Sequence, residues 1–242
     1  MVDGLLDKSI GIIIQARMSS ERLPGKVLLP FPINGTKTIL STIYEKCVES
    51  GASVVIATSN SPESDILEQY CLEHKYLYYR GSENDVLSRF YEIQKTYNFK
   101  YIFRFTADNP FVDLNMLEFF FNRFKSEPLD YAYSTGMPLG MNFEIIKGKI
   151  IEELSALSLT NSEKEHVTLG IRNRQSFKMK AIELSNNSAI RLTIDEPSDY
   201  AQANLICQYL AGEVTLLSII KLKECHPWML SINSSVSQKR PA

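Results

Sequence analysis

A basic loop follows the first strongly apolar segment of the chain. Arg17, Arg22 and Lys26 lie close together in it, beside a single acidic residue. Arginine offers paired donors and lysine a compact positive charge, a combination that suits the oxygens of a polyphosphate. Hydroxyl groups and consecutive backbone N–H groups can complete a nest around an anion. The sequence therefore predicts a phosphate-binding loop, to which Ser19 and Ser20 add hydroxyl groups.

The competing interpretation of this loop is a solvent-exposed basic segment without a ligand. The loop matches neither the G-x-x-x-x-G-K-[ST] pattern of a P-loop nor the G-x-G-x-x-G pattern of a dinucleotide site. The whole chain, however, carries 26 Lys and Arg against 28 Asp and Glu, a net charge of -2. Because cations are not in general excess, their concentration in one loop favours phosphate binding. The same balance disfavours a nucleic-acid partner.

Two carboxylates are candidates for a metal site. Asp108 follows the apolar segment Tyr101–Phe105, and Asp195 follows the segment Arg191–Ile194. Mg²⁺ binds through one or two carboxylates together with substrate phosphates and water. Each aspartate also has a purely structural interpretation: Asp108 can shape a turn before a proline, and Asp195 can cap the next helix. Ser198 offers an alternative cap, which would leave Asp195 free.

Short apolar segments that alternate with helical patterns must position these groups. Segments rich in β-branched and aromatic residues predict buried strands, and the spacing of apolar residues between them predicts helices. Such alternation gives right-handed crossovers and a mostly parallel sheet, with ligands bound beyond the carboxyl ends of the strands. We expect strands at Ile10–Ile14, Val54–Ala57, Tyr76–Tyr79 and Tyr101–Phe105, and helices at Thr38–Ser50, Ser61–Tyr70, Asp85–Tyr97 and Leu114–Phe124.

The regular alternation ends after about Leu129. Four short strands and four helices are expected in the remaining part, which favours a single α/β domain with a smaller subregion in its C-terminal half. The strands are expected at Tyr131–Tyr133, Phe143–Ile146, Phe177–Ile182 and Arg191–Ile194, and the helices at Ile150–Leu157, Ser162–Arg174, Asp199–Leu210 and Val214–Leu222.

The composition is that of a globular protein. Of 242 residues, 44% are hydrophobic, and no apolar run approaches the roughly 20 residues that a membrane helix needs. The four cysteines are scattered, so we expect buried thiols and no zinc framework. The segment Met1–Lys8 has acidic residues where a signal peptide needs basic ones, which predicts a cytoplasmic protein without a membrane partner.

Five motifs give the chain a family resemblance. Ile12–Leu28, which contains the basic loop, resembles the opening of the sugar-acid cytidylyltransferases and is similar to their spore-coat polysaccharide biosynthesis protein F branch. The wider family includes the synthetases of CMP-sialic acid and CMP-3-deoxy-manno-octulosonate. The resemblance spans about residues 10 to 210, with departures at Ser19, Ala107 and Asn142. The other motifs, in the order of the family, are Arg80–Leu87, Arg104–Pro110, Glu165–Thr168 and Arg191–Pro197.

This resemblance implies a fold and a reaction. The fold is Rossmann-like, of the nucleotide-diphospho-sugar transferase type, with a mostly parallel mixed sheet flanked by helices. The reaction is Mg²⁺-dependent transfer of CMP from CTP to a hydroxyl of a sugar acid by a homodimer, with release of pyrophosphate, for surface polysaccharide or lipopolysaccharide biosynthesis. The implied site comprises the catalytic residues Arg17, Lys26 and Asp108, the metal ligands Asp108 and Asp195, the nucleotide contacts Ala16, Ser19, Ser20, Arg22, Thr58, Ser82 and Arg104, and the acceptor contacts Asn142, Glu144, Glu165 and His166.

Several alternatives stay open. A glycosyltransferase of similar fold would use a nucleotide-sugar donor, although the chain lacks the Asp-x-Asp motif typical of that class. A nucleotide-binding paralogue with impaired chemistry is suggested by the departures from the family pattern. Glu165 and His166 can instead serve helix packing or a dimer contact.

We expect one domain over 1–232, with a nucleotide-binding half at about 10–130, an acceptor subregion at about 131–195, C-terminal helices at 196–232 and a flexible tail at 233–242.

Overall fold

The structure is a computed structural model of the chain, and it describes residues 5–238. The predictions for residues 1–4 and 239–242, which belong to the expected non-secretory N-terminus and flexible tail, lie outside the described residues. Within the described part, no helix is long and apolar enough to cross a membrane.

Seven strands form one mixed sheet in the order β3-β2-β1-β4-β6-β5-β7. β1 pairs in parallel with β2 and β4, and β2 pairs in parallel with β3. β6 is antiparallel to both of its neighbours, β4 and β5, whereas β7 is parallel to β5. This topology confirms the expected mostly parallel mixed sheet. The strands are β1 (Ile10–Gln15), β2 (Ser53–Ser59), β3 (Tyr78–Gly81), β4 (Tyr101–Thr106), β5 (Tyr131–Thr135), β6 (Glu144–Lys147) and β7 (Met179–Glu183).

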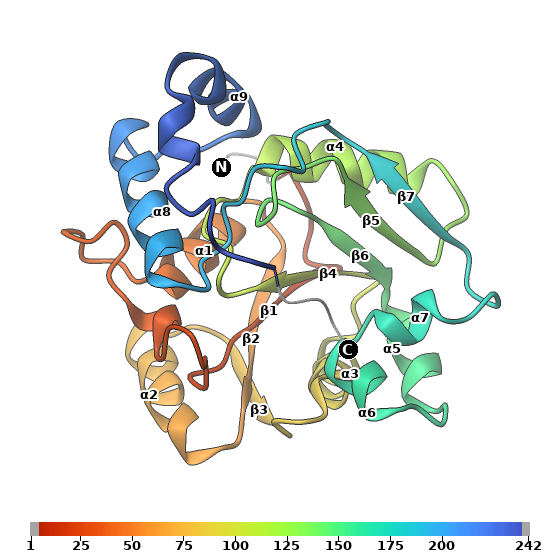
Figure 1. Cartoon of the computed structure of the whole chain (residues 1–242). Helices are drawn as coiled ribbons and strands as arrows, with labels where there is room; N and C mark the ends of the chain where they lie inside the picture. The colour runs from red at the N-terminus through yellow and green to blue at the C-terminus, as the bar shows by residue number, and fades with distance from the viewer. Residues whose placement is uncertain (1–4, 239–242) are drawn as a thin grey trace.

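Helices cover both faces of this sheet (Figure 1). One face packs against α1, α2, α4, α8 and α9, and the other packs against α3, α5 and α7, with the short α6 just before α7. The helices are α1 (Ile39–Val48), α2 (Asp65–His74), α3 (Val86–Tyr97), α4 (Leu114–Lys125), α5 (Gly148–Ser155), α6 (Asn161–Glu165), α7 (Leu169–Arg172), α8 (Pro197–Tyr209) and α9 (Leu216–Cys225).

The central strand β1 shows how the sequence specifies this layering. Successive side chains of a strand point to opposite faces of the sheet. Ile12 and Ile14 accordingly join the apolar cluster on one face, and Ile13 joins the cluster on the other. All three side chains are fully buried, which stabilises the fold by about 1.5–3 kcal/mol each. A strand buried on both faces therefore needs the continuous apolar run found here.

The expected strand at Arg191–Ile194 is wrong. Among residues 5–238, its one sheet-like contact is an isolated bridge between Leu139 and Arg191. The N–H of Ile194 donates to the backbone oxygen of Asp108 at 2.9 Å, so the segment bonds to a loop and not to a strand. Its apolar residues are buried, which explains the strand-like pattern. Its backbone instead bonds to the loop that carries Asp108 and leads directly into the loop that carries Asp195.

The expected helix at Ser162–Arg174 is also wrong, because it divides into α6 and α7. The chain leaves the helical conformation at Val167, whose φ is 34°. A β-branched residue with positive φ is strained and persists where surrounding contacts hold it. Val167 is fully buried, and the hydroxyl of Thr168 donates to Glu144 at 3.1 Å. The break thus turns Thr168 toward the sheet.

Three smaller predictions also need correction. β3 begins at Tyr78 and ends at Gly81, two residues later than expected. The N-cap of α8 is Glu196, not Ser198, and Asp195 does not cap the helix. Asn233, expected at the start of a flexible tail, is buried, and its side chain donates to Asp199 at 2.7 Å. The expected division of the chain into subregions stays a prediction.

Candidate active site

Lys26 lies between two carboxylates at the carboxyl ends of the central strands. Gly25, whose φ is 68°, provides the turn that leads from the basic loop into a short 3-10 helix beginning at Lys26. The Lys26 Nζ lies 2.9 Å from Asp108 Oδ2 and 2.8 Å from Asp195 Oδ1. Its third bond, at 2.7 Å, goes to the backbone oxygen of Ile194. An ammonium group has three donors, so the geometry uses all of them within the protein.

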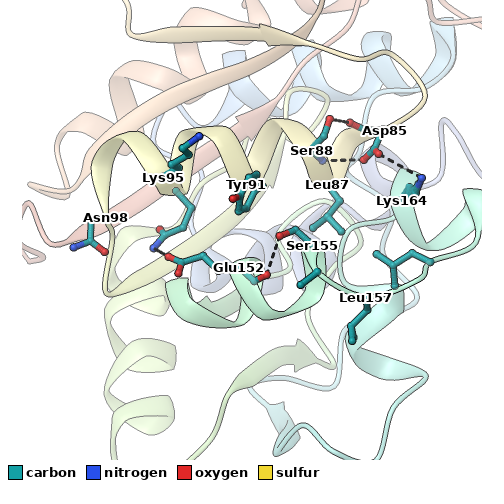
Figure 2. A pocket seen from close by; sticks show the side chains of 13 residues that line it. Asp85, Leu87, Ser88, Tyr91, Lys95, Asn98, Glu152, Ser155, Leu157 and Lys164 are labelled. Carbon is teal, nitrogen blue, oxygen red and sulfur yellow. Dashed lines mark hydrogen bonds and ion pairs between the residues drawn. The ribbon is translucent and has the colours of Figure 1, made fainter.

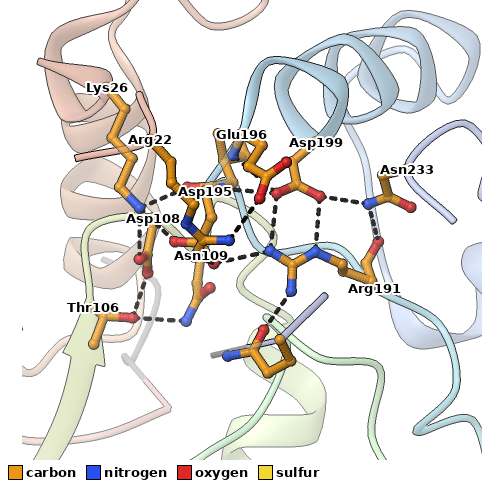
Figure 3. Close-up of polar contacts among 12 residues, drawn as sticks. Arg22, Lys26, Thr106, Asp108, Asn109, Arg191, Asp195, Glu196, Asp199 and Asn233 are labelled. Atoms are coloured by element: carbon orange, nitrogen blue, oxygen red, sulfur yellow. Dashed lines mark hydrogen bonds and ion pairs between the residues drawn. The ribbon is translucent and has the colours of Figure 1, made fainter. Parts of the chain in front are cut away.

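Asp195 is the centre of a wider charged network (Figure 3). Arg191 donates to Asp195 Oδ2 at 2.9 Å and makes two bonds, at 2.8 and 2.9 Å, with Asp199. Asp199 also accepts from the backbone N–H groups of Asp195 and Glu196, each at 3.0 Å. This bidentate pair fixes the loop before α8, and with it the direction of the Asp195 carboxylate.

The environment of Asp195 keeps its carboxyl group ionised. Burial raises the pKa of Asp195, but the charge of Lys26 and hydrogen bonds from Lys26 and Arg191 outweigh burial and lower this pKa below 3.8. An ionised carboxylate is the form that binds a cation. The basic loop adds a further contact, since Arg22 lies 3.2 Å from Asp195 and 2.8 Å from Glu196.

A cavity of about 360 Å³ lies over this cluster. It brings together the basic loop and both aspartates, as the sequence predicts. Its walls come from the ends of β1 and β4, the basic loop, α3 and the loop before α8. The lining residues are Gln15, Arg17, Ser19, Ser20, Glu21, Arg22, Lys26, Val27, Arg89, Thr106, Ala107, Asp108 and Asp195.

A larger cavity of about 870 Å³ adjoins the first. The two share five lining residues, so both aspartates face the junction between them. The shared residues are Arg17, Arg22, Thr106, Asp108 and Asp195. Two adjoining cavities that meet at a carboxylate pair can hold two reactants with their reacting groups side by side.

Glu144 organises the wall of the larger cavity. Arg104 and Arg172 each donate to it at 2.7 Å, and the hydroxyl of Tyr131 donates at 2.5 Å. Burial raises the pKa of Glu144, but the two arginines outweigh burial and lower this pKa below 4.5. The guanidinium of Arg172 also lies 4.3 Å from the ring centre of Tyr133. Two cations thus face one anion, which leaves a local excess of positive charge.

The sequence did not single out Arg172, although a signal exists. Arg172 stands four residues after Thr168, and residues four apart lie on the same side of a helical turn. Both side chains reach Glu144. The family motif ends at Thr168 and therefore does not include the arginine one helical turn beyond it.

Only some of the remaining predicted residues line the two cavities. His166, Asn142 and Arg104 line the larger cavity, so Arg104 is on the expected acceptor side and not in the smaller cavity. Glu165 is exposed and lines neither cavity. Three predicted nucleotide contacts also line neither cavity: Ala16 and Thr58, which are buried, and Ser82, whose hydroxyl caps the N–H of Asp85.

A third cavity, of about 720 Å³, is lined by residues of α3, α5 and the segments next to them (Figure 2). It runs between α3 and α5, and several of its polar groups pair with each other, as in the 3.8 Å contact between Lys164 and Asp85. It shares no lining residue with either cavity at the strand ends. The junction cavities are therefore the candidate active site.

The site consists of cations and a carboxylate pair beyond the carboxyl ends of the strands of an α/β sheet, which is where such sheets bind their ligands. A family model described as "Cytidylyltransferase" matches residues 11–219. The chain therefore belongs to the cytidylyltransferase family and is a nucleotidyltransferase. This family membership confirms the resemblance inferred from the five motifs.

Individual relatives agree with this assignment. The spore coat polysaccharide biosynthesis protein SpsF of Bacillus subtilis is 37% identical over 212 residues, which cover 83% of this chain and 87% of that protein. A cytidylyltransferase from Leptospira borgpetersenii has a similar structure, with a TM-score of 0.83 and 28% identity over 96% of this chain and all of that chain. The CTP complex of CMP:2-keto-3-deoxy-manno-octonic acid synthetase has a similar fold, with a TM-score of 0.63 and 16% identity over 85% of this chain and 99% of that chain.

Proposed function

We propose that this enzyme transfers CMP from CTP to a hydroxyl group of a sugar acid and releases pyrophosphate. The observation that carries the proposal is the position of Lys26 between Asp108 and Asp195, at the junction of two cavities. A triphosphate in the smaller cavity and an acceptor in the larger one would meet at this point. The SpsF relative supports a role in the synthesis of a surface polysaccharide.

The proposed step replaces a phosphoanhydride bond at the α-phosphorus with a phosphate ester bond. The acceptor hydroxyl oxygen attacks the α-phosphorus of CTP, and its proton passes to solvent. The bond from the α-phosphorus to the bridging oxygen breaks, and pyrophosphate leaves with that electron pair. The catalytic contribution of the protein is positioning and charge neutralisation, as in other phosphoryl transfers.

The cations of the basic loop would neutralise the triphosphate. Lys26 lines the smaller cavity, and its charge would act there at short range although its three donors are already bonded within the protein. Arg17 is exposed and lines both cavities, so it can reach phosphate oxygens of CTP as the triphosphate enters. Donors that are already oriented stabilise developing charge without reorganisation during the reaction.

The residues present fit a divalent metal ion. Asp108 and Asp195 already converge on one cationic group, the Lys26 ammonium. Among the described residues, no group of three or more His, Cys, Asp or Glu side chains could hold a metal ion. A metal ion here would therefore take its other ligands from phosphates and water, as Mg²⁺ does. Asp108 and Asp195 would hold it, and it would supply further charge neutralisation at the triphosphate.

The larger cavity supports a sugar acid as acceptor. Arg172 and Arg104 leave a positive excess around Glu144, which suits the carboxylate of an acceptor. Asn142, Glu144 and His166 line the same cavity and can bond to sugar hydroxyl groups.

Since CTP is supplied inside the cell, we further propose a cytoplasmic enzyme. The homodimer also stays a proposal, testable by light scattering.

A pyrophosphate-release assay tests the function. The protein is incubated with CTP, Mg²⁺ and a panel of nonulosonic, octulosonic and smaller sugar acids, with neutral sugars as matched controls. We expect release with at least one sugar acid and none with its neutral counterpart. Silence across the panel, from a protein that binds CTP, would exclude sugar acids as the acceptor class.

A further inference from the structure

The chain that follows α9 returns to the larger cavity. A short 3-10 helix, η3 (Pro227–Leu230), comes after α9, and the segment 233–238 then leaves the α8 and α9 side of the molecule (Figure 1). At Gln238 this segment lines the larger cavity, which Asp195 and Arg172 also line. The family model matches residues 11–219, so the family match assigns no role to the segment.

A buried asparagine anchors the segment 233–238. Asn233 is 2% exposed, and its side-chain amide donates to Asp199 at 2.7 Å and to the backbone oxygen of Arg191 at 3.2 Å (Figure 3). Its backbone N–H donates to the side chain of Gln202 at 3.3 Å. A buried amide that belongs to a bonded network of this kind is held in one position. The segment therefore starts from the same side chains that fix Asp195.

Arg191 orients the side-chain amide of Gln238. Arg191 Nη1 donates to the amide oxygen of Gln238. Because a guanidinium has donors only, this oxygen faces Arg191, and the NH₂ group of the amide is directed away from Arg191. Arg191 also donates to Asp195 Oδ2 at 2.9 Å. One guanidinium thus holds Gln238 beside a carboxylate of the candidate metal site.

Uncharged residues line part of the larger cavity. The arginines around Glu144 suit the carboxylate of an acceptor, as proposed above. Ser188, Thr193 and Gln238 also line this cavity, and each can both donate and accept a hydrogen bond without carrying a charge. Such groups suit hydroxyl groups of a ligand. Of the three, Gln238 is the one that shares its partner Arg191 with Asp195.

We propose that Gln238 is a specificity-determining residue that bonds to a hydroxyl group of the acceptor next to the hydroxyl that receives CMP. The reacting hydroxyl must lie beside Asp108 and Asp195 to reach the α-phosphorus, and Gln238 is held on the Asp195 side of the larger cavity. A site that bonds to a hydroxyl group disfavours a ligand that lacks it. The acceptor is therefore a sugar acid with hydroxyl groups on adjacent carbons. This inference rests on the proposed function, because it takes a sugar acid as the acceptor.

Steady-state kinetics with deoxy acceptors test the inference. An accepted sugar acid and its deoxy analogues, each lacking one hydroxyl other than the reacting one, are assayed by pyrophosphate release with the unaltered protein, Gln238→Ala and Gln208→Ala. Gln208 is exposed on α8 and lines neither cavity, so it is the matched control. We expect Gln238→Ala to raise the KM of the complete acceptor about threefold to tenfold, as the loss of one neutral hydrogen bond does. The Kd of CTP, measured by calorimetry, should not change, and Gln208→Ala should change neither quantity.

The deoxy analogues separate a direct contact from an indirect effect. One analogue should have a KM raised by the same factor with the unaltered protein, and Gln238→Ala should raise that KM no further, because both changes remove the same bond. The other analogues should respond to Gln238→Ala in full. An equal response of every analogue would show that Gln238 contacts no hydroxyl group and would overturn the inference. A lower kcat or weaker CTP binding with an unchanged acceptor KM would show that Gln238 acts through Arg191 and Asp195, which also overturns it.

Failure of the inference and failure of the proposed function give different results. If the unaltered protein is active and Gln238→Ala keeps its acceptor KM, the inference alone is wrong. If the unaltered protein releases no pyrophosphate with any sugar acid, the proposed function fails, and the inference fails with it. Gln238 is exposed, so the melting temperature of Gln238→Ala should stay within about 2 °C of that of the unaltered protein, which checks that the variant folds.

Discussion

The Lys26 Nζ lies 2.8 Å from Asp195 Oδ1, although 169 positions of the chain separate the two residues. The pair joins the loop after β1 to the loop before α8, and the second bond of Lys26 to an aspartate, Asp108, adds the loop after β4. A lysine placed in this way holds three loops together and contributes its positive charge to the wall of the smaller cavity. Its substitution should therefore impair catalysis.

We expect Lys26→Met to lower kcat at least about a hundredfold, because a preoriented cation at the reacting phosphate is lost. Steady-state pyrophosphate release measures this effect. Lys46→Met is the control, since Lys46 forms an exposed pair with Glu49 far from the cavities. Full activity in Lys26→Met would show that Lys26 is not a catalytic residue.

Glu144 should make stability depend on pH. Its pKa is lowered in the folded protein, so its contribution is present above pH 4.5 and is lost as the pH falls through the folded pKa. Glu144→Gln should cost about 3–5 kcal/mol near pH 7, since two arginines lose their partner, and less at pH 3. Urea unfolding at several pH values measures this difference.

Glu127→Gln is the matched control for the pH experiment. Glu127 pairs with Lys180 at the surface, where both side chains are more than one-third exposed. Such a pair contributes at most about 1 kcal/mol. A cost for Glu144→Gln that stays constant from pH 7 to pH 3 would mean that the carboxylate charge is not what stabilises this cluster.

Arg172 should discriminate acceptors by their carboxylate. Arg172→Met should raise the KM for a sugar acid roughly tenfold or more, because a charge-assisted bond is lost, and leave the Kd of CTP unchanged. The neutral counterpart of the same sugar is the control ligand, and its weak binding should not change. Equal losses of affinity for CTP and for the acceptor would indicate instead that the substitution disrupts the structure of the cavity wall.

Lys75 offers a test of the backbone that does not depend on function. It ends α2 with a φ of 58°, a conformation that costs a side-chain-bearing residue about 1–2 kcal/mol. Lys75→Gly should raise the free energy of unfolding by about 0.5–1 kcal/mol after the entropy of the unfolded chain is included. Lys46→Gly, inside α1, should instead lower it by about 1 kcal/mol. Destabilisation by Lys75→Gly would contradict the assigned conformation.

The parts of the fold that local pattern determines could be predicted from the sequence. β1 is a continuous apolar run, and α3 spans Val86–Tyr97, within one residue of the helix that the apolar spacing predicts. The basic loop and the carboxylates Asp108 and Asp195 were also recognisable, because their residue types are unusual at strand ends and match a family pattern. Side chains at the ends of adjacent parallel strands come together whatever the details of the helices.

The parts that depend on contacts across the chain could not be predicted. The apolar pattern of Arg191–Ile194 resembles a strand, but Arg191 is committed to Asp199, and Ile194 bonds to Asp108. Thr58 has a strand-end position, yet its side chain is buried. Arg89 lies within an ordinary amphipathic helix, and only the packed structure shows that it is buried and that, within residues 5–238, its Nε has no hydrogen-bond partner.

The fate of the three phosphates of CTP tests the central claim most directly. The protein is incubated with Mg²⁺, an accepted sugar acid and CTP labelled with ³²P at either the α- or the γ-phosphate. Transfer of CMP predicts that the α-label enters a sugar-linked product and the γ-label leaves as pyrophosphate, and that Asp108→Ala and Asp195→Ala lose both. Release of the γ-label as inorganic phosphate, with the α-label kept in CDP, would contradict the account.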